Sequence, residues 1–312
     1  MKNDVRILIT APGFARDDSE PIDMMRARGW TLDFNETGSM LERAELMRRI
    51  AEADGILLGT EKVDREVLDA ARRLKVISRY GVGLDNVDVA CAREKGIQVL
   101  NAAGANATAV ADMAVTMMLM LSRGSLKLDA QVREGDWTEP VGVEPEGKLL
   151  GIVGLGNIGA QVAKRAKGFG MRVIAYDSFR NEKLAAEAGV AYVDTLDELL
   201  ARADYVTLHV PHTAQTHHMI GRAQLDAMKP GAILINTARG GIIDEAALAE
   251  ALQSGRLGGA GLDVFEEEPL PLDSPLLKCP RTVFSPHTAA DTHESARKVS
   301  LATVQNLIKV LQ

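Results

Sequence analysis

The chain has few cysteines, no net positive charge and no long apolar run, and each of these absences excludes a class of protein. Only Cys91 and Cys279 occur among 312 residues, too few for a disulfide scaffold in a chain this long. The first residues, from Met1 to Arg6, carry charges where a secretory signal needs an apolar segment. We therefore expect a reducing, cytoplasmic setting.

Acidic residues outnumber basic ones by 43 to 36, which gives a formal net charge of −7. Such a surface repels phosphate backbones, so nucleic acid is not expected as a partner. The most apolar stretch runs from Ala109 to Leu121 and is interrupted by Asp112. It falls short of the ~20 residues that a membrane-spanning helix needs. We expect no membrane association.

Short apolar runs alternate with helical stretches along almost the whole chain. The runs are nearly continuous rather than alternating, as in strands that are covered by helices on both faces. This pattern predicts an α/β fold with parallel sheets. The predicted strands are Val5–Thr10, Gly55–Leu58, Val76–Ser78, Gln98–Leu100, Leu149–Gly154, Arg172–Tyr176, Tyr205–Val210, Ala232–Asn236, Gly261–Val264 and Val283–Ser285.

Two βα blocks are indicated, one ending near Leu100 and one beginning at Leu149. Between them, Ala105–Arg123 is typical of a single long helix that is apolar nearly all round. Such a helix must be covered on both sides. Burial within one domain and burial against a second subunit both explain the pattern.

A glycine-rich turn joins the strand at 149–154 to the helix that follows. It reads Gly154-Leu155-Gly156-Asn157-Ile158-Gly159. Gly154 permits the tight turn, Gly156 lets the backbone approach a pyrophosphate, and Gly159 lets helix and strand pack closely. The helix N-terminus then offers free N–H groups to the phosphates. The motif predicts a dinucleotide site.

Asp177 ends the next predicted strand, 18 positions after Gly159, where a ribose-binding carboxylate is expected. A carboxylate accepts hydrogen bonds from the ribose hydroxyls and repels a 2′-phosphate, so NAD is favoured over NADP. Arg180 lies three residues further on. It is either a solvated loop residue or a group that weakens this preference.

Several polar residues follow predicted strands in the second block. They are Arg239, Asp263, Glu268 and His287. Ligands of doubly wound sheets bind outside the carboxyl ends of the strands, so these residues can converge on one crevice. His209 also follows a strand, whereas His212, His217, His218 and His293 are expected at the surface.

Arginine, histidine and glutamate beside a nicotinamide suit hydride transfer to and from a 2-hydroxyacid. The arginine binds the carboxylate through two hydrogen bonds, and the histidine moves the hydroxyl proton. A carboxylate orients the histidine and favours its protonated form. Residue types alone leave the acid/base role open between His209 and His287. No metal is expected at this site.

The chain resembles the D-isomer-specific 2-hydroxyacid dehydrogenase family, and within it most closely the phosphoglycerate dehydrogenase branch. Matching segments in family order cover most of the chain from about Leu57. They are 79–88, 101–110, 154–159, 209–211, 236–241, 263–269 and 285–290.

The resemblance implies a role for each matching residue. Arg239 would hold the substrate carboxylate, His287 would be the acid/base and Glu268 its partner, which decides against His209. Val210, Thr237 and Ala238 would line the cofactor, together with the motif residues Gly154, Gly156, Asn157, Ile158 and Gly159 and the carboxylates Asp177 and Asp263. Gly81, Val82, Gly83 and Asn106 would contact the substrate.

The resemblance also implies two Rossmann- or flavodoxin-like domains with an active-site cleft between them. Residues 1–100, completed by 290–312, would form the substrate-binding domain, and residues 101–289 the NAD domain. The long helix 105–123 would serve a homodimer interface.

The expected reaction is NAD-dependent interconversion of a D-2-hydroxyacid and its 2-oxoacid, first of all 3-phosphoglycerate in serine biosynthesis. Some family members hold the substrate's anionic end with an arginine in the loop that corresponds to Gly59-Thr60, where this chain has none. Lys62 or Arg79 could take the place of this arginine in binding the anionic end of the substrate. A glyoxylate or hydroxypyruvate reductase is the alternative. An NAD-sensing binding protein, similar to the corepressor relatives, is the rival from another class.

Overall fold

The computed structural model describes residues 5–139 and 141–312, and these residues form two compact units. One unit contains the chain up to Asn106 together with Ala290–Gln312. The other contains Ala107–Ala289. The division falls after residue 106 rather than after residue 100, so residues 101–106 belong with the first unit.

The first unit is built on a five-stranded parallel sheet in the order β2-β1-β3-β4-β5. Helices α2, α3 and α4 cover one face, and α1 and α12 cover the other. The strands are β1 (Arg6–Ile9), β2 (Thr31–Phe34), β3 (Gly55–Leu58), β4 (Val76–Arg79) and β5 (Gln98–Asn101). The helices are α1 (Glu20–Arg26), α2 (Arg43–Ile50), α3 (Arg65–Ala70), α4 (Val89–Glu94) and α12 (His293–Leu311).

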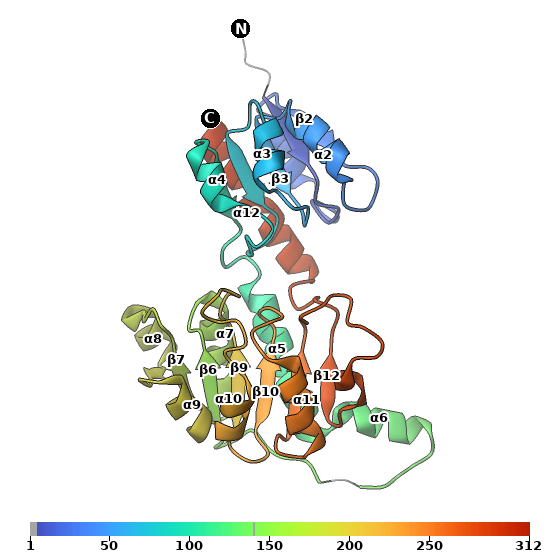
Figure 1. The fold of residues 1–312 in the computed structure, drawn as a ribbon, viewed down its shortest axis with the longest axis vertical. Coiled ribbons are helices and arrows are strands. Elements are labelled where there is room, and N and C mark those ends of the chain that lie inside the picture. The colour runs from blue at the N-terminus through green and yellow to red at the C-terminus, as the bar shows by residue number, and fades with distance from the viewer. Residues whose placement is uncertain (1–4, 140) are drawn as a thin grey trace. The chain divides into compact units, whose positions relative to one another are not determined.

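The C-terminal helix α12 returns to the first unit and packs against β3, β4 and β5 of its sheet (Figure 1). Its residues Val304, Leu307 and Ile308 are buried in the same core as β1 and α1. The hydroxyl of Ser78 in β4 donates to the carbonyl of Thr303 in α12 at 2.9 Å. The end of the chain is therefore part of the first core.

The second unit contains a seven-stranded parallel sheet in the order β12-β11-β10-β9-β6-β7-β8. The strand order reverses between β6 and β9, which is where doubly wound sheets open a crevice for a ligand. The strands are β6 (Leu149–Val153), β7 (Arg172–Tyr176), β8 (Ala191–Tyr192), β9 (Tyr205–Leu208), β10 (Ile233–Asn236), β11 (Gly259–Leu262) and β12 (Thr282–Phe284).

Helices cover both faces of this second sheet. On one face lie α5 (Ala107–Arg123), α7 (Asn157–Gly168) and α8 (Glu182–Ala188). On the other face lie α9 (Leu196–Arg202), α10 (Arg222–Ala227) and α11 (Glu245–Gln253). The remaining elements are α6 (Ser125–Arg133) and the short helix η1 (Pro275–Lys278). Two parallel α/β sheets confirm the predicted fold class.

Helix α5 is apolar nearly all round because the second unit covers much of its surface. It packs against α7 and against strands β10, β11 and β12. Met117 is 1% exposed, and its Cβ lies 2.9 Å from the position that a Cβ on Gly261 would take. Met113 and Met120 remain partly buried. Burial within one unit therefore explains most of the sequence pattern.

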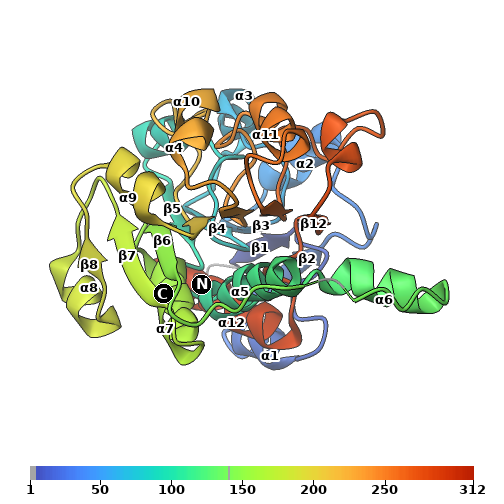
Figure 2. The same ribbon diagram turned by 90° about the horizontal axis from the view of Figure 1, so that it is seen from below.

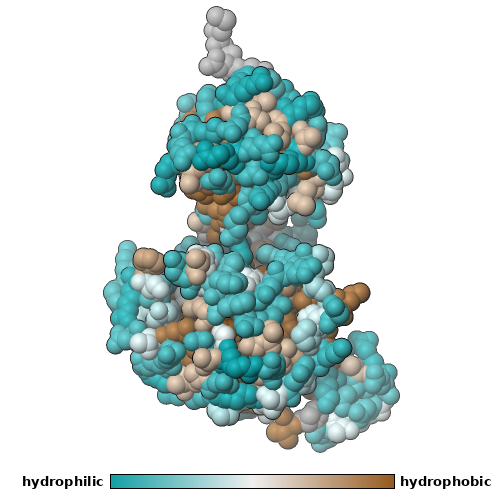
Figure 3. All heavy atoms as spheres, viewed as in Figure 1, coloured by the Kyte–Doolittle hydropathy of each residue, from teal (hydrophilic) through white to brown (hydrophobic). Residues whose placement is uncertain are grey.

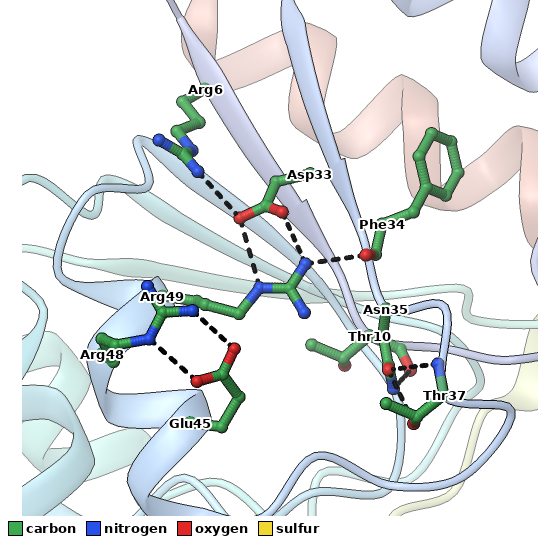
Figure 4. A network of polar contacts seen from close by, with 9 residues as sticks. All are labelled: Arg6, Thr10, Asp33, Phe34, Asn35, Thr37, Glu45, Arg48 and Arg49. Carbon is green, nitrogen blue, oxygen red and sulfur yellow. Dashed lines mark hydrogen bonds and ion pairs between the residues drawn. The ribbon is translucent and has the colours of Figure 1, made fainter.

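The first unit contains an ion-pair network that ties β1 and β2 to α2 (Figure 4). The carboxylate of Asp33 lies 3.1 Å from the guanidinium of Arg6 and 2.5 Å from that of Arg49. Burial alone raises the pKa of Asp33, but the two guanidinium groups outweigh it and lower that pKa. The network holds the edge strand β2 in place.

The visible face of each unit is mostly hydrophilic, with scattered small apolar patches (Figure 3). No single helix in the described part of the chain is long and apolar enough to cross a membrane. Only α5 and α6 taken together, bent by 60° at their junction, pass that test of length and composition. Cys91 and Cys279 are free and buried.

Candidate active site

The glycine turn follows β6 at the point where the strand order reverses, and two of its glycines are required by close contacts. Gly154 has φ +96°, and a Cβ there would lie 2.7 Å from the carbonyl oxygen of His209. A Cβ on Gly159 would lie 2.4 Å from the carbonyl oxygen of Gly154. A side chain at either position would force strand, turn and helix apart.

Gly156 differs from these two because nothing lies within 4 Å of the Cβ that it lacks. It is the N-cap of the 12-residue helix α7, whose first residues are Asn157 and Ile158, and no side chain caps this end. The first N–H groups of the helix and its positive dipole end are thus available to an anion. The open space and the uncapped helix fit a pyrophosphate.

The carboxylate of Asp177 is fixed at the end of β7 by two backbone donors. It accepts hydrogen bonds at 2.9 Å from the N–H groups of Leu155, in the glycine turn, and Phe179. Asp177 is thereby held beside the turn, as a ribose-binding carboxylate must be. Its remaining lone pairs can accept hydrogen bonds from sugar hydroxyls.

Arg180 is held by groups of the 192–194 segment. Its guanidinium donates to the carbonyl of Val193 at 2.9 Å and to Asp194 at 2.8 Å, and it lies 5.4 Å from the centre of the Tyr192 ring. The hydrogen bond to Asp194 raises the pKa of Arg180. Because these contacts hold the guanidinium of Arg180 against the 192–194 segment, the arrangement fits NAD better than NADP.

Two buried polar atoms at the ends of β9 and β10 have no hydrogen-bond partner. They are Nδ1 of His209 and Oγ1 of Thr237. The other nitrogen of His209, Nε2, lies 3.0 Å from the hydroxyl of Thr207. Burial lowers the pKa of His209 to about 3, so its imidazole is neutral at physiological pH. Both atoms lie just past the carboxyl ends of β9 and β10, and β9 pairs directly with β6, the strand before the glycine turn. Each can form a hydrogen bond with a bound group.

Arg239 lies in a tight turn after β10 that Asn236 closes. The Asn236 side chain accepts from the N–H of Ala238 at 3.0 Å and donates to the carbonyl of Arg239 at 2.8 Å. The turn is pressed against the neighbouring loop, since a Cβ on Gly240 would lie 1.8 Å from the carbonyl oxygen of Phe265. Asn236 is a residue that the sequence reasoning overlooked, although it ends the strand directly before Thr-Ala-Arg.

His287 and Glu268 form a direct pair. Nδ1 of His287 lies 2.7 Å from Oε2 of Glu268, whose other oxygen accepts from the N–H of Phe265 at 3.0 Å. His287 has φ +56°, an unusual backbone conformation for a residue other than glycine. Since Nδ1 faces the carboxylate, Nε2 is the nitrogen that can exchange a proton with a ligand.

Asp263 holds the loop that carries His287. Its buried carboxylate accepts from the N–H groups of Thr288 and Ala289, both at 2.9 Å, and from the Ser285 hydroxyl. The backbone carbonyl of Asp263 accepts from the N–H of His287 at 2.8 Å. This positioning role was not foreseen, because nothing in the sequence shows that 263 and 285–289 are neighbours.

His209 and His287, the two acid/base candidates, have different surroundings. His287 is partly exposed and carries a carboxylate partner. Nε2 of His209 lies 3.0 Å from the hydroxyl of Thr207, and its Nδ1 is buried without a hydrogen-bond partner. A neutral imidazole with a strongly lowered pKa is a poor proton carrier near pH 7. The geometry favours His287.

The predicted substrate-binding loop of the first unit follows β4. Its backbone is held from the 101–102 segment: the N–H of Ala102 donates to the carbonyl of Gly81 at 2.9 Å, and the Asn101 side chain donates to the carbonyl of Val82 at 2.6 Å. The side-chain oxygen of Asn106 is buried without a hydrogen-bond partner. Gly81, Val82 and Gly83 are all partly exposed.

Comparison with known proteins identifies the second unit. Residues 115–289 match the family described as D-isomer specific 2-hydroxyacid dehydrogenase, NAD binding domain. A D-3-phosphoglycerate dehydrogenase of Methanocaldococcus jannaschii is 46% identical over 281 residues, covering 89% of this chain and 53% of that protein. A glyoxylate reductase of Korarchaeum cryptofilum is 45% identical over 270 residues, covering 84% of this chain and 81% of that protein.

The fold has solved counterparts. A glyoxylate reductase crystal structure from Paecilomyes thermophila superposes with a TM-score of 0.90 at 33% identity, covering 100% of this chain and 96% of that one. The chain spans about half the length of the phosphoglycerate dehydrogenases that it matches, 53% in the first case and 57% in the second. The resemblance drawn from the motifs is confirmed, and so is NAD as the cofactor.

Proposed function

Because this chain belongs to the D-isomer specific 2-hydroxyacid dehydrogenase family, we propose that it interconverts a D-2-hydroxyacid and its 2-oxoacid with NAD as hydride carrier. The observation that carries the proposal is the His287–Glu268 pair, with Nδ1 and Oε2 2.7 Å apart. The pair lies in the same unit as the glycine turn and Asp177. Bound NAD supplies the hydride acceptor, and NADH the donor.

Each polar residue has one task in this reaction. Arg239 binds the substrate carboxylate with its guanidinium fork. During reduction of the 2-oxoacid, Nε2 of His287 gives a proton to the carbonyl oxygen, and during oxidation it takes the hydroxyl proton back. Glu268 orients the ring and stabilises its protonated form.

The remaining predicted site residues hold the cofactor and the substrate. We assign Gly154, Gly156, Asn157, Ile158 and Gly159 to the pyrophosphate and Asp177 to the ribose. Val210, Thr237, Ala238 and Asp263 line the nicotinamide end. We further assign backbone N–H groups of Gly81, Val82 and Gly83, and the side chain of Asn106, to the substrate.

The best substrate within this class is 3-phosphoglycerate, paired with 3-phosphohydroxypyruvate. One cation supports it in the first unit. Nη1 of Arg79 donates to the carbonyl of Tyr80 and lies 3.1 Å from the position that a Cβ on Gly81, in the proposed substrate loop, would take. A guanidinium there can attract a second anionic group on the substrate.

Glyoxylate or hydroxypyruvate is the second candidate, and the loop after β3 favours it. Glu61 in this loop is 4% exposed, and its carboxylate accepts from the Thr10 hydroxyl at 2.8 Å and from the Leu41 N–H at 3.3 Å. A buried carboxylate repels phosphate. Glyoxylate reductases and phosphoglycerate dehydrogenases occur at almost equal identity among the relatives.

The deciding experiment is NADH oxidation by the purified protein against six 2-oxoacids. The panel is 3-phosphohydroxypyruvate, hydroxypyruvate, glyoxylate, pyruvate, 2-oxoglutarate and sulfopyruvate. A much higher kcat/KM for the phosphorylated compound supports a role in serine biosynthesis. A higher value for an unphosphorylated acid keeps the dehydrogenase and rejects the phosphoglycerate assignment.

No turnover with any acid, while NADH still binds, would contradict the proposed activity. That outcome would favour an NAD-sensing binding protein, similar to the corepressor relatives. The His287–Glu268 pair argues for the enzyme, since binding a dinucleotide does not need an acid/base pair at the carboxyl ends of the strands.

We also propose that the chain forms a homodimer through α5 and the arm that follows it, residues 125–139 and 141–147. Figures 1 and 2 show α6 projecting from the second unit, and none of its residues is buried. The arm exposes Leu126, Val132, Trp137 and Val141 at 50, 53, 80 and 98%. Exposed apolar side chains in such number mark an interaction surface.

Light scattering after gel filtration tests the dimer. Trp137→Asp combined with Val141→Asp is expected to give a monomer. Phe179→Asp, at another exposed aromatic side chain of the same unit, is expected to leave the mass unchanged. A monomeric wild-type protein would contradict the proposal. The cytoplasmic location stays a prediction.

A further inference from the structure

Three histidines that the sequence places at the surface come together in the loop after β9. Nε2 of His212 lies 3.2 Å from Nδ1 of His217. The ring of His217 stacks on that of His218, with centroids 4.0 Å apart and planes 21° apart. Nε2 of His218 lies 2.9 Å from Oε1 of Glu266.

The loop is folded so that the first two histidines lie close together. The Thr216 hydroxyl donates to the carbonyl of Pro211 at 2.6 Å and accepts from the N–H of Thr213 at 2.8 Å. These bonds draw together the two ends of the segment between the histidines. The backbone therefore holds His212 and His217 close together, and their side-chain torsions decide how the rings face each other.

The separation of the two imidazole nitrogens matches that of two ligands on one metal ion. Two nitrogens bound at about 2.0–2.1 Å to a tetrahedral ion lie about 3.3 Å apart. His212 and His217 are both exposed to solvent, so water can fill the other coordination positions without loss of hydration. Imidazole nitrogens select zinc, copper and nickel over magnesium and calcium.

We propose that His212 and His217 bind one divalent transition-metal ion of the zinc type, and that this ion inhibits the proposed dehydrogenase. Within residues 5–139 and 141–312, no group of three or more His, Cys, Asp or Glu side chains is placed to hold a metal. The site therefore has two protein ligands, whereas structural zinc sites have four. We expect the ion to bind reversibly, with a dissociation constant in the micromolar range.

The position of the pair connects it to the candidate active site. Nε2 of His212 lies 3.0 Å from the place that a Cβ on Gly241 would take, and Gly241 is two residues from Arg239. The N–H of His218 donates to the carbonyl of Gly241 at 2.8 Å. His218 also holds Glu266, two residues before Glu268.

Metal binding changes this arrangement because both nitrogens must direct their lone pairs at the ion. The hydrogen bond between His212 and His217 is lost, and both rings rotate. Rotation of His212 changes its contact with Gly241, and rotation of His217 disturbs its stacking on His218. The turn that carries Arg239 and the one that carries Glu268 are therefore both affected.

Metal binding is measured on the complete chain after chelator treatment, with Zn²⁺ in competition with a chromophoric chelator. We expect one zinc ion per chain. His212→Asn and His217→Asn should each weaken it by about tenfold or more, a size typical when groups that support a metal site are lost. His293→Asn is the matched control, because His293 is exposed but pairs with Asp17 in the first unit.

Binding of Cu²⁺ allows the metal ligands to be identified in the unaltered protein. Electron paramagnetic resonance of the unaltered protein with one equivalent of Cu²⁺ should show coupling to two imidazole nitrogens. A spectrum without nitrogen coupling would overturn the site, as would zinc affinity that both variants leave unchanged. Zinc binding that disappears only in His287→Asn would place the ion on the acid/base histidine and reject the proposal.

The inhibition is tested separately from binding and rests on the proposed function. Micromolar Zn²⁺ should lower the rate of NADH oxidation by the wild type and leave the rate of His212→Asn unaffected. Equal inhibition of both proteins would reject the coupling. The binding measurements need no turnover, so they stand or fall independently of the dehydrogenase activity.

Discussion

Nδ1 of His287 lies 2.7 Å from Oε2 of Glu268, which leaves Nε2 as the nitrogen that faces away from the carboxylate. The pair joins two loops that are 19 positions apart in the sequence. A second bond, from the N–H of Phe265 to Oε1 of Glu268, fixes the carboxylate itself. The imidazole thus has a defined tautomer and orientation before any ligand binds.

Replacing Glu268 with Gln should lower kcat by a factor of about 10²–10³, because the protonated ring loses its counter-charge while its position is largely kept. His287→Ala should lower kcat at least as much. Both are measured as NADH oxidation at saturating substrate. Glu267→Gln, one residue away in the same acidic run, should have near-normal turnover. Full activity of His287→Ala would return the acid/base role to His209.

Arg239→Ala should lower kcat/KM by about 10²–10⁴-fold, since the guanidinium both binds the carboxylate and polarises the neighbouring carbonyl. NADH binding, followed by its fluorescence, should survive. Arg222→Ala, at an exposed arginine of the same unit that pairs with Glu250, serves as the control. Near-normal turnover by Arg239→Ala would reject its role as the carboxylate-binding residue.

Asp177→Asn should narrow the preference for NADH over NADPH, because the negative charge that repels a 2′-phosphate disappears. The amide oxygen of Asn can still accept from the N–H of Leu155, so the turn should keep its shape. The ratio of the two dissociation constants is the measurement. Asp194→Asn frees Arg180 from its carboxylate partner and should change the ratio less. An unaltered ratio in Asp177→Asn would contradict the assignment.

Burial lowers the pKa of His209 to about 3, so we expect the free energy of unfolding to depend on pH. Between pH 6.5 and 3 the unfolded chain binds a proton at His209 that the folded chain does not bind. Stability is therefore fully present above pH 6.5 and is lost as the pH falls. From pH 7.5 to pH 5 the loss from this residue is about 1–2 kcal/mol.

Urea unfolding of the wild type and of His209→Asn at both pH values measures this loss. The variant should lose less stability on acidification than the wild type by about that amount. His293 provides a contrast, because the hydrogen bond to Asp17 raises its pKa and gives it the opposite sign. An equal loss in wild type and His209→Asn would show that His209 titrates normally in the folded chain.

The sequence by itself determined the fold class and most of the elements. Short continuous apolar runs that alternate with helical stretches are typical of strands covered on both faces, so their number and spacing favour parallel α/β sheets. The glycine turn was also evident from the sequence, because its glycine spacing directly after a strand is a local pattern. The need for Gly159 arises from a local contact with Gly154, whereas Gly154 is also restricted by the distant His209. Two of the four edge strands escaped prediction. The strand β2 contains Asp33 between apolar residues, and β8 has two residues, so neither forms an apolar run.

Only the tertiary structure decided which distant residues meet. Asp263 supports the His287 loop, His218 contacts Glu266, and His212 lies beside Gly241. The return of α12 to the first core likewise depends on contacts across the whole length of the chain. Sequence periodicity reports the surroundings of a residue along its own helix or strand. Which loops lie side by side at the carboxyl ends of the strands depends on strand order, which local patterns do not contain.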